Sequence, residues 1–432
     1  MTVPAPAGNA KKLIASRQMR GSNHDEGITM RLRLMLATSA LLVACSGERT
    51  RAADAPPEPE KVVGEGVLAV LPMHVASRIP LIEVRVGTSE PLNFVVDTGF
   101  EVNVLDVDVA RRLKLPLGSQ TKEDAPGGAV ATFQLPPQQL RLADRQVQNV
   151  SFTAIPVAGL GGLLGRPVAG ILGHFFLTRL VVELDFRAER MRLLDPRAWQ
   201  YRGAGQVLPV RIVDDQVLVD CELEMPGRKK LVAAYKLDTG SFDVAGLALN
   251  YVRKERVIGP GIQEVVCTGV GAGGKTEARR FRAQAFRIGP LSIERPVLGY
   301  VVEARGFENR PFAGTVSMSI LRLGRLVLDY QRRRIILEPA ASAKHTEDLS
   351  GLILVSPPPD FSKVVVAQVL PGSAADDAGL KAGDELLRID DAEPRLESAR
   401  GMFESAKPRK VRYRRDNQKG SVTLLPRPYP PR

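Results

Sequence analysis

The chain has 432 residues, of which 44% are hydrophobic and 5% aromatic, with 3 cysteines and 4 histidines. This length predicts two or three domains, and the ordinary apolar fraction argues against wholesale disorder and against a polytopic membrane protein. Three cysteines cannot hold together a protein of this size, and the CxxC, HExxH, GxSxG and Walker motifs are all absent from the sequence. We expect neither a metal ion nor a cofactor.

The net charge is +12, from 60 Lys and Arg against 48 Asp and Glu. Six basic and two acidic residues precede Cys45, so part of this charge belongs to the N-terminal segment. The densest basic run, residues 332–334, lies between two strand-like segments and indicates a solvated hairpin turn. Because few aromatic residues accompany the basic ones, we do not expect nucleic acid as a partner.

The N-terminal region has the pattern of an export signal. Residues 30–33 carry two arginines, residues 34–44 form an apolar run, and Cys45 follows. An apolar run of this length is too short to span a bilayer. Leu42-Val43-Ala44-Cys45 resembles the lipobox of bacterial lipoproteins, which implies cleavage before Cys45, its lipidation, and a membrane-anchored protein on the periplasmic face or the cell surface. The alternative is a buried helix followed by a chance cysteine.

Two segments flank this signal. Residues 1–29 are polar and patternless, so we expect the true start at Met30 and a signal peptide over residues 30–45. Residues 46–63 are polar, carry three prolines and are expected to form an unstructured tether. Beyond Cys45, Cys221 and Cys267 are either paired in a disulfide or buried as free thiols.

An internal repeat predicts the fold. Residues 92–105 and 231–247 are apolar, strand-like runs that each contain Asp-Thr-Gly. A second matched pair follows at residues 170–177 and 314–321, each leading into two further strand-like segments. The distance from Asp97 to Gly170 is 73 positions and that from Asp238 to Gly314 is 76. We therefore predict a duplicated, mainly β unit with lobes at residues 64–200 and 205–340, each of six to eight strands.

The pair of Asp-Thr-Gly loops resembles that of retropepsin-like and pepsin-like aspartic proteases, in which two apolar residues and a glycine follow each loop downstream. The resemblance implies two β-barrel-type lobes with Asp97 and Asp238 as the catalytic pair. It implies that Thr98 and Thr239 form hydrogen bonds across the two loops. The loops are completed by the remaining support residues, Gly99, Gly240 and Ser241.

Peptide-bond hydrolysis by this route explains why two carboxyl groups are needed. Two carboxylates about 3 Å apart cannot both ionise, so they share one proton. The ionised member deprotonates a water molecule that attacks the carbonyl carbon, and the protonated member polarises the carbonyl oxygen. Glycine after threonine lets each loop turn tightly. Because both lobes lie on one chain, a monomer could build the whole site.

Glycine-rich segments between the paired motifs are candidate flaps over a cleft. Gly271, Gly273 and Gly274 form the better candidate, and residues 126–129 the poorer one. The sequence departs from the family pattern at Phe100, where a small polar residue is usual, and at Ser317, where glycine is usual. The alternative interpretation is two β-lobes in which Asp-Thr-Gly is only a tight turn and nothing is hydrolysed.

The C-terminal region, residues 349–428, closely resembles a bacterial PDZ domain through residues 364–390, which contain a strand, Pro-Gly-Ser-Ala-Ala and Ala-Gly-Leu-Lys-Ala-Gly-Asp. This resemblance implies a small α+β domain that binds a protein or peptide C-terminus by strand addition. The helix at residues 396–406 would line its groove. The carboxylate of the bound chain end would lie on the loop of Ser350, Gly351 and Leu352. The alternative is a PDZ fold that only caps the protease lobes.

Two functions of different class follow from these features. The first is an exported, lipid-anchored aspartic endopeptidase that acts on polypeptides and uses its PDZ domain for substrate binding or regulation. The second is a non-catalytic lipoprotein scaffold that binds peptide ends, with degenerate protease lobes. Phe100 favours the scaffold, and the two complete Asp-Thr-Gly triplets favour the enzyme. A cytosolic protein with an incidental apolar N-terminal segment is a third option.

Overall fold

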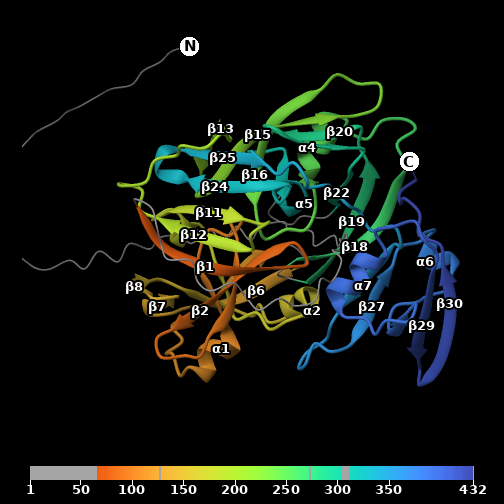
Figure 1. Cartoon of the computed structure of the whole chain (residues 1–432), viewed down its shortest axis with the longest axis horizontal. Helices are drawn as coiled ribbons and strands as arrows, with labels where there is room; N and C mark the ends of the chain where they lie inside the picture. Colours follow the sequence, from red (N-terminus) through yellow and green to blue (C-terminus); the bar gives the residue numbers. More distant parts are fainter. Residues whose placement is uncertain (1–65, 126–127, 272–273, 303–310, 432) are drawn as a thin grey trace, which may run out of the picture. The chain divides into compact units, whose positions relative to one another are not determined.

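The computed structural model describes residues 66–125, 128–271, 274–302 and 311–431 (Figure 1). The predicted signal peptide, the predicted lipidation site Cys45 and the predicted tether at residues 46–63 lie outside these ranges. Within them, none of the helices has the length and apolar character needed to cross a bilayer. The described chain is mainly β, as predicted, and consists of two groups of strands followed by a small α+β module.

The first group, which we call lobe 1, contains twelve of the described strands and three short helices. The strands are β1 (Val67–Ala76), β2 (Ile79–Val86), β3 (Leu92–Val96), β4 (Val104–Asp106), β5 (Gln120–Ala125), β6 (Gly128–Gln134), β7 (Gln138–Leu142), β8 (Arg145–Val150), β9 (Thr153–Ile155), β10 (Gly170–Leu172), β11 (Val181–Asp185) and β12 (Arg190–Leu194). The helices are α1 (Val107–Arg112), α2 (Leu160–Leu164) and α3 (His174–Leu177).

The second group, lobe 2, contains thirteen of the described strands. They are β13 (Gln206–Pro209), β14 (Arg211–Val213), β15 (Gln216–Glu224), β16 (Leu231–Asp238), β17 (Ala245–Leu247), β18 (Glu264–Gly271), β19 (Gly274–Arg282), β20 (Ala285–Ile288), β21 (Leu291–Glu294), β22 (Val297–Val301), β23 (Gly314–Ser317), β24 (Gly324–Asp329) and β25 (Arg334–Pro339). The helices are α4 (Leu249–Lys254), α5 (Met318–Leu321) and the 3-10 turn η1 (Tyr330–Arg332). The expectation of six to eight strands per lobe was too low, because strands of three to five residues show too little alternation to be recognised.

The C-terminal module has a five-stranded sheet and two helices. Its elements are β26 (Leu352–Val355), β27 (Val364–Val369), α6 (Ala374–Asp377), β28 (Glu385–Ile389), α7 (Leu396–Met402), β29 (Arg409–Arg415) and β30 (Gln418–Leu424). The strands follow one another in sequence order across the sheet, so that β26 is an edge strand. Apolar residues of β26, β28 and α7 form its core with Phe403, which is fully buried.

Both lobes repeat one arrangement of strands at the centre of the fold. In lobe 1, β3 runs parallel to β10 with Val96 opposite Leu172, and β4 pairs with the other edge of β10 in antiparallel fashion. In lobe 2, β16 runs parallel to β23 with Asp238 opposite Ser317, and β17 takes the antiparallel position. These pairings match the two copies of the sequence repeat.

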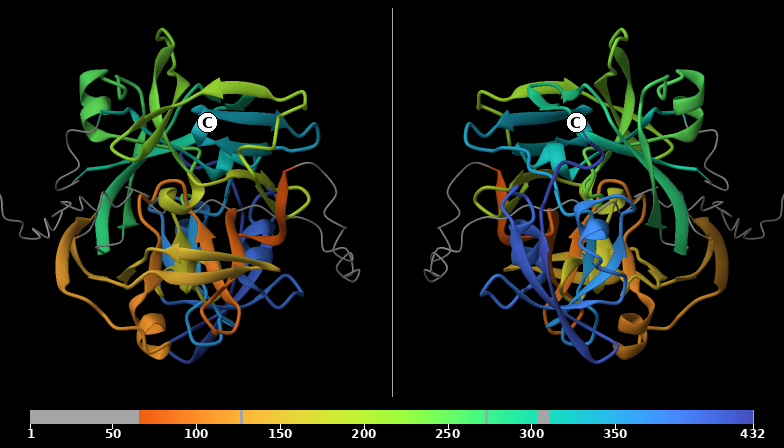
Figure 2. Two further views of the ribbon diagram at one scale, coloured as in Figure 1. Left: turned by 90° about the vertical axis from the view of Figure 1, so that its left-hand side faces the viewer. Right: turned by 90° about the vertical axis from the view of Figure 1, so that its right-hand side faces the viewer.

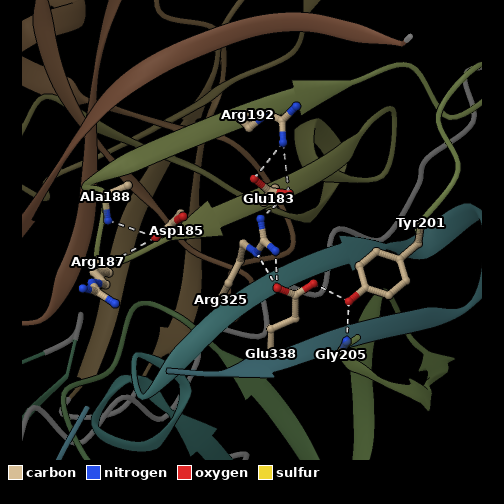
Figure 3. A network of polar contacts seen from close by, with 9 residues as sticks. All are labelled: Glu183, Asp185, Arg187, Ala188, Arg192, Tyr201, Gly205, Arg325 and Glu338. Carbon is tan, nitrogen blue, oxygen red and sulfur yellow. Dashed lines mark hydrogen bonds and ion pairs between the residues drawn. The ribbon is translucent and has the colours of Figure 1, made fainter. Parts of the chain in front are cut away.

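A continuous sheet joins the lobes, because β11 of lobe 1 pairs with β24 of lobe 2 in antiparallel register. Figure 2 shows the green and cyan strands of lobe 2 in the upper half of each view and the orange strands of lobe 1 below them. Buried Glu183 on β11 forms ion pairs with Arg192 at 3.2 Å and with Arg325 on β24 at 3.7 Å (Figure 3). Arg325 in turn binds Glu338, which also accepts a hydrogen bond from Tyr201.

The predicted basic turn is confirmed. Asp329 and Arg334 are paired at the ends of β24 and β25, and exposed Arg332 and Arg333 lie between the two strands. Asp329 is fully buried, and its carboxylate accepts hydrogen bonds from Arg332 and Arg334. Two of the three arginines therefore stabilise the turn rather than forming a free basic patch.

Candidate active site

The two aspartates lie at equivalent positions of the two lobes. Asp97 directly follows β3, and its backbone N–H donates to the carbonyl of Leu172 on β10 at 3.0 Å. Asp238 ends β16, opposite Ser317 on β23. The exposed fraction is 5% for Asp97 and zero for Asp238. Each loop is therefore held at the end of a parallel strand pair inside the protein.

The threonines connect the two loops in a reciprocal manner. Thr98 Oγ1 accepts from the backbone N–H of Thr239 at 3.1 Å and donates to the carbonyl of Leu237 at 2.9 Å. Thr239 Oγ1 accepts from the N–H of Thr98 at 3.0 Å and donates to the carbonyl of Val96 at 2.7 Å. These four buried hydrogen bonds fix the position of one loop relative to the other, as the family resemblance implied.

The glycines bring the carboxyl groups close together. The N–H of Gly99 donates to Asp97 Oδ1 at 2.7 Å, and that of Gly240 donates to Asp238 Oδ1 at 3.1 Å. A Cβ atom added to Gly99 would lie 2.7 Å from Asp238 Cγ, and one added to Gly240 would lie 2.3 Å from Asp97 Cγ. Each glycine thus contacts the carboxyl group of the opposite loop, and no side chain larger than hydrogen fits at either position.

The electrostatics of the pair favour one retained proton. Burial and the charge of Asp238 raise the pKa of Asp97 to about 7. The N–H groups of Gly99 and Gly240 and the charge of Lys236 act in the opposite direction and reduce the shift. The site can therefore hold a protonated and an ionised carboxyl side by side near neutral pH.

Lys236 is a site residue that the sequence reasoning missed. It is 2% exposed, lies two residues before Asp238, and donates from Nζ to the carbonyl of Gly99 at 3.2 Å. A cation from lobe 2 thus binds the Asp-Thr-Gly loop of lobe 1. The sequence feature that could have identified it is a lysine within an otherwise apolar strand, at the position where lobe 1 has Val95.

The two departures from the family pattern have different structural settings. Phe100 is partly exposed, and its carbonyl accepts from the N–H of His174, the first residue of α3, at 2.7 Å. Ser317 is fully buried in extended backbone, with its hydroxyl 3.5 Å from Thr315 Oγ1. At the matching position of lobe 1, a Cβ atom on Gly173 would lie 2.3 Å from the carbonyl of Val102. Glycine is therefore required in lobe 1 but not in lobe 2.

Ser241 is 2% exposed, and its carbonyl accepts from the N–H of Met318 at 3.0 Å, a bond that connects the second Asp-Thr-Gly loop to α5.

The flap candidates lie in β-hairpins. Gly271 and Gly274 are paired at the tip of the β18–β19 hairpin, and Gly273 lies outside the described residues. Gly274 has φ +127°, a conformation that favours glycine. The second candidate is the β5–β6 hairpin of lobe 1, whose residues 126–127 also lie outside the described ranges.

A second buried carboxyl group near the pair was also missed. Asp243 is 8% exposed, and its carbonyl accepts from the N–H of Ser319. Burial raises its pKa to about 8, with a further contribution from the charge of Asp238, while Arg280 and Arg78 act in the opposite direction. Arg280 Nη2 lies 3.9 Å from Asp243 Oδ1. An aspartate five positions after Asp238 carries no sequence signal of burial.

The predicted carboxylate loop of the C-terminal module has its N–H groups satisfied by nearby side chains. The N–H groups of Ser350 and Gly351 donate to Asp348 Oδ1 at 3.0 and 2.7 Å. The N–H of Leu352 donates to Ser350 Oγ at 3.0 Å. Gly351 has φ +76°, and a Cβ atom there would lie 2.2 Å from that of Ser373.

Other predicted groups can be placed as well. Cys221 and Cys267 are buried free thiols, which decides between the two alternatives left by the sequence. Across the part of the chain that the structure describes, no three His, Cys, Asp or Glu side chains are grouped as ligands for a metal ion.

Comparisons with known proteins agree with two of these regions. A family model described as aspartyl protease matches residues 82–176, which contain the first Asp-Thr-Gly loop. A model of the PDZ domain matches residues 344–407, which include β26, its preceding loop and α7. A search of the curated proteins finds no match.

Proposed function

From a chain that contains an aspartyl protease domain and a PDZ domain, we propose an aspartic endopeptidase of the retropepsin-like type that acts on polypeptides. The observation that carries the proposal is the reciprocal bonding of Thr98 and Thr239, which places Asp97 and Asp238 against one another. An Asp-Thr-Gly triplet used only as a turn would require neither the second loop nor the contact of each glycine with the opposite carboxyl group.

The carboxyl groups divide the catalytic work between them. One carboxyl group of the pair holds the shared proton, which the raised pKa of Asp97, about 7, supports, and the ionised partner accepts a proton from the attacking water. The water oxygen bonds to the peptide carbonyl carbon, while the shared proton of the pair is hydrogen-bonded to the carbonyl oxygen. The C–N bond then breaks, and the leaving amine takes a proton from the pair, so protons and electron pairs balance.

The location of the protein belongs to the same proposal. The basic and apolar residues before Cys45 support export and lipid anchoring at a membrane on the periplasmic face or the cell surface. Replacing Cys45 with serine is expected to move the protein from the membrane fraction to the soluble fraction. A Cys45→Ser protein that stays in the membrane fraction would contradict the lipid anchor.

Peptide cleavage by the chain from residue 46 to residue 432 tests the activity, using a peptide library across pH 4 to 8. Asp97→Asn and Asp238→Asn are each expected to abolish cleavage, as is a pepstatin-type transition-state analogue. Asp215→Asn, which changes an exposed carboxylate, serves as the matched control and is expected to leave cleavage unchanged. The rate should fall above about pH 7, where the pair loses its shared proton.

Two outcomes would contradict this assignment. Cleavage that survives Asp97→Asn but not Asp238→Asn would indicate a site built from two copies of lobe 2. An absence of cleavage by the wild type across the library would favour the scaffold that binds peptide ends.

A further inference from the structure

The outer edge of β26 is the place where a PDZ domain receives a peptide strand. Backbone groups of three alternate residues on this strand already have partners within the chain. The N–H of Leu352 binds Ser350 Oγ, and the carbonyl of Leu354 accepts from Arg400 Nη2 on α7 at 2.7 Å. The N–H of Ser356, just past the strand, donates to the carbonyl of Gly162 in α2 of lobe 1 at 2.7 Å.

The helix side of the groove also contacts lobe 1. A Cβ atom on Gly165, at the end of α2, would lie 3.2 Å from Leu396 Cδ2 on α7. The N–H of Ser77, in the turn between β1 and β2, donates to Glu397 Oε1 on α7 at 3.3 Å. Ser77 Oγ accepts a hydrogen bond from Arg400 and lies 3.3 Å from the carbonyl of Leu163, to which it is a donor.

Apolar packing reinforces these polar contacts. Leu163 of α2 packs against the cluster that contains Ile353 of β26 and Leu370, both of which are buried. In Figure 1, α2 lies next to the blue elements of the PDZ domain. Segment 160–165 of lobe 1 therefore contacts both walls of the groove, the strand β26 and the helix α7.

The position of the chain-end carboxylate is filled separately. The N–H groups of Ser350 and Gly351 donate to the Asp348 carboxylate. In a peptide complex, N–H groups of this loop would instead bind the terminal carboxylate of the peptide. The hydroxyl of Ser350 also donates to Asp348, at 2.8 Å. Asp348 thus acts as an internal substitute for a ligand carboxylate.

We infer that the PDZ groove is an intramolecular interface, occupied by segment 160–165 of lobe 1 and by the Asp348 carboxylate. The C-terminus of another polypeptide competes with this segment and binds only after segment 160–165 has dissociated from the groove. The apolar core beside the edge strand, formed by Leu352, Leu354, Leu396 and Ala399, selects a competitor with an apolar C-terminal residue.

Peptide binding and hydrogen exchange on the full chain test this inference without reference to peptide cleavage. The probe is a fluorescein-labelled decapeptide that ends in valine with a free carboxylate, and its C-terminal amide is the control ligand. Leu163→Glu places a charge against the apolar cluster that contains Ile353 and Leu370 and is expected to raise affinity for the free-carboxylate probe at least tenfold. Leu425→Glu is the matched control, because Leu425 is 59% exposed in the same domain.

Hydrogen exchange reports the same event at the edge strand. Amides of residues 352–356 should exchange faster in Leu163→Glu than in the wild type and should be unchanged in Leu425→Glu. Circular dichroism checks that the variants are folded. If Leu163→Glu does not fold, Ser77→Ala, which removes the hydroxyl shared by Arg400 and Leu163, should shift affinity and exchange in the same direction by a smaller factor.

The Asp348 carboxylate is tested by its own pair of variants. Asp348→Ala should strengthen binding of the free-carboxylate probe and not of the amide, whereas Asp391→Ala, on an exposed turn of the same domain, should change neither. The inference is overturned if the wild type binds the free-carboxylate probe as tightly as Leu163→Glu does. It is also overturned if exchange at residues 352–356 is the same in the folded variant and the wild type.

Discussion

Thr98 holds the site together through a single hydroxyl group with two buried partners. Thr98→Val keeps the shape of the side chain but leaves the N–H of Thr239 and the carbonyl of Leu237 without their partner. Each unsatisfied buried group costs about 1–3 kcal/mol, so the free energy of unfolding should fall by about 2–5 kcal/mol. Urea titration measures this loss. Thr98→Ser retains the hydroxyl and should recover most of it, whereas equal losses in both variants would show that the methyl group matters instead.

The raised pKa of Asp97 predicts how stability depends on pH. Between about pH 4 and pH 7 the folded protein retains a proton on Asp97 that the unfolded chain has lost, so this group makes stability fall as pH rises. Asn at position 97 removes that contribution. The free energy of unfolding of Asp97→Asn, relative to the wild type, should therefore increase from pH 4 to pH 7 in urea titrations. Asp215→Asn is the control, and a difference that stays constant with pH would contradict the assignment.

At the scale of elements, the parallel pairs β3–β10 and β16–β23 depend on glycine at the start of the second strand. A Cβ atom on Gly170 would lie 2.2 Å from the carbonyl of Val104, and one on Gly314 would lie 2.1 Å from that of Gly246. Because these neighbours are backbone atoms, they cannot move away from an added methyl group as a flexible side chain could. Gly170→Ala and Gly314→Ala should therefore each lower the free energy of unfolding by about 3 kcal/mol or more.

Gly159 provides the control for these substitutions. No atom lies within 4 Å of a Cβ atom at this position, and its backbone is right-handed. Gly159→Ala should therefore change stability by less than about 1 kcal/mol in the same titration. A loss at Gly159 as large as that at Gly170 would show that steric contact does not explain the requirement.

Several elements could be predicted from the sequence because their residues have few alternatives. Asp-Thr-Gly and the downstream glycine are required by close approach of backbone and carboxyl groups, so the central strand pairs were recognisable. The pairing of β11 with β24 was not, since an apolar strand does not specify its partner. The Leu-Gly-Gly-Leu-Leu sequence of α2 carries no polar signal for its contact with the PDZ domain. The partner of Lys236 lies in the other lobe, 137 residues away.

At the scale of the whole molecule, one chain supplies both Asp-Thr-Gly loops and the sheet that joins the lobes. If the proposed peptidase activity is present, we therefore expect it in the monomer, with a specific activity that does not change on dilution. Light scattering and cleavage assays over a hundredfold range of protein concentration measure this. A specific activity that falls on dilution together with dissociation of a dimer would contradict it.

The joining sheet also constrains the order in which the chain can fold during synthesis. The outer edge of β11 (Val-Val-Glu-Leu-Asp) finds its partner only when residues 324–329 become available, about 140 positions later. Until then a completed lobe 1 presents an unpaired apolar edge, which another copy can bind in place of β24. We therefore expect protein that is terminated before residue 324 to aggregate more readily than the full chain.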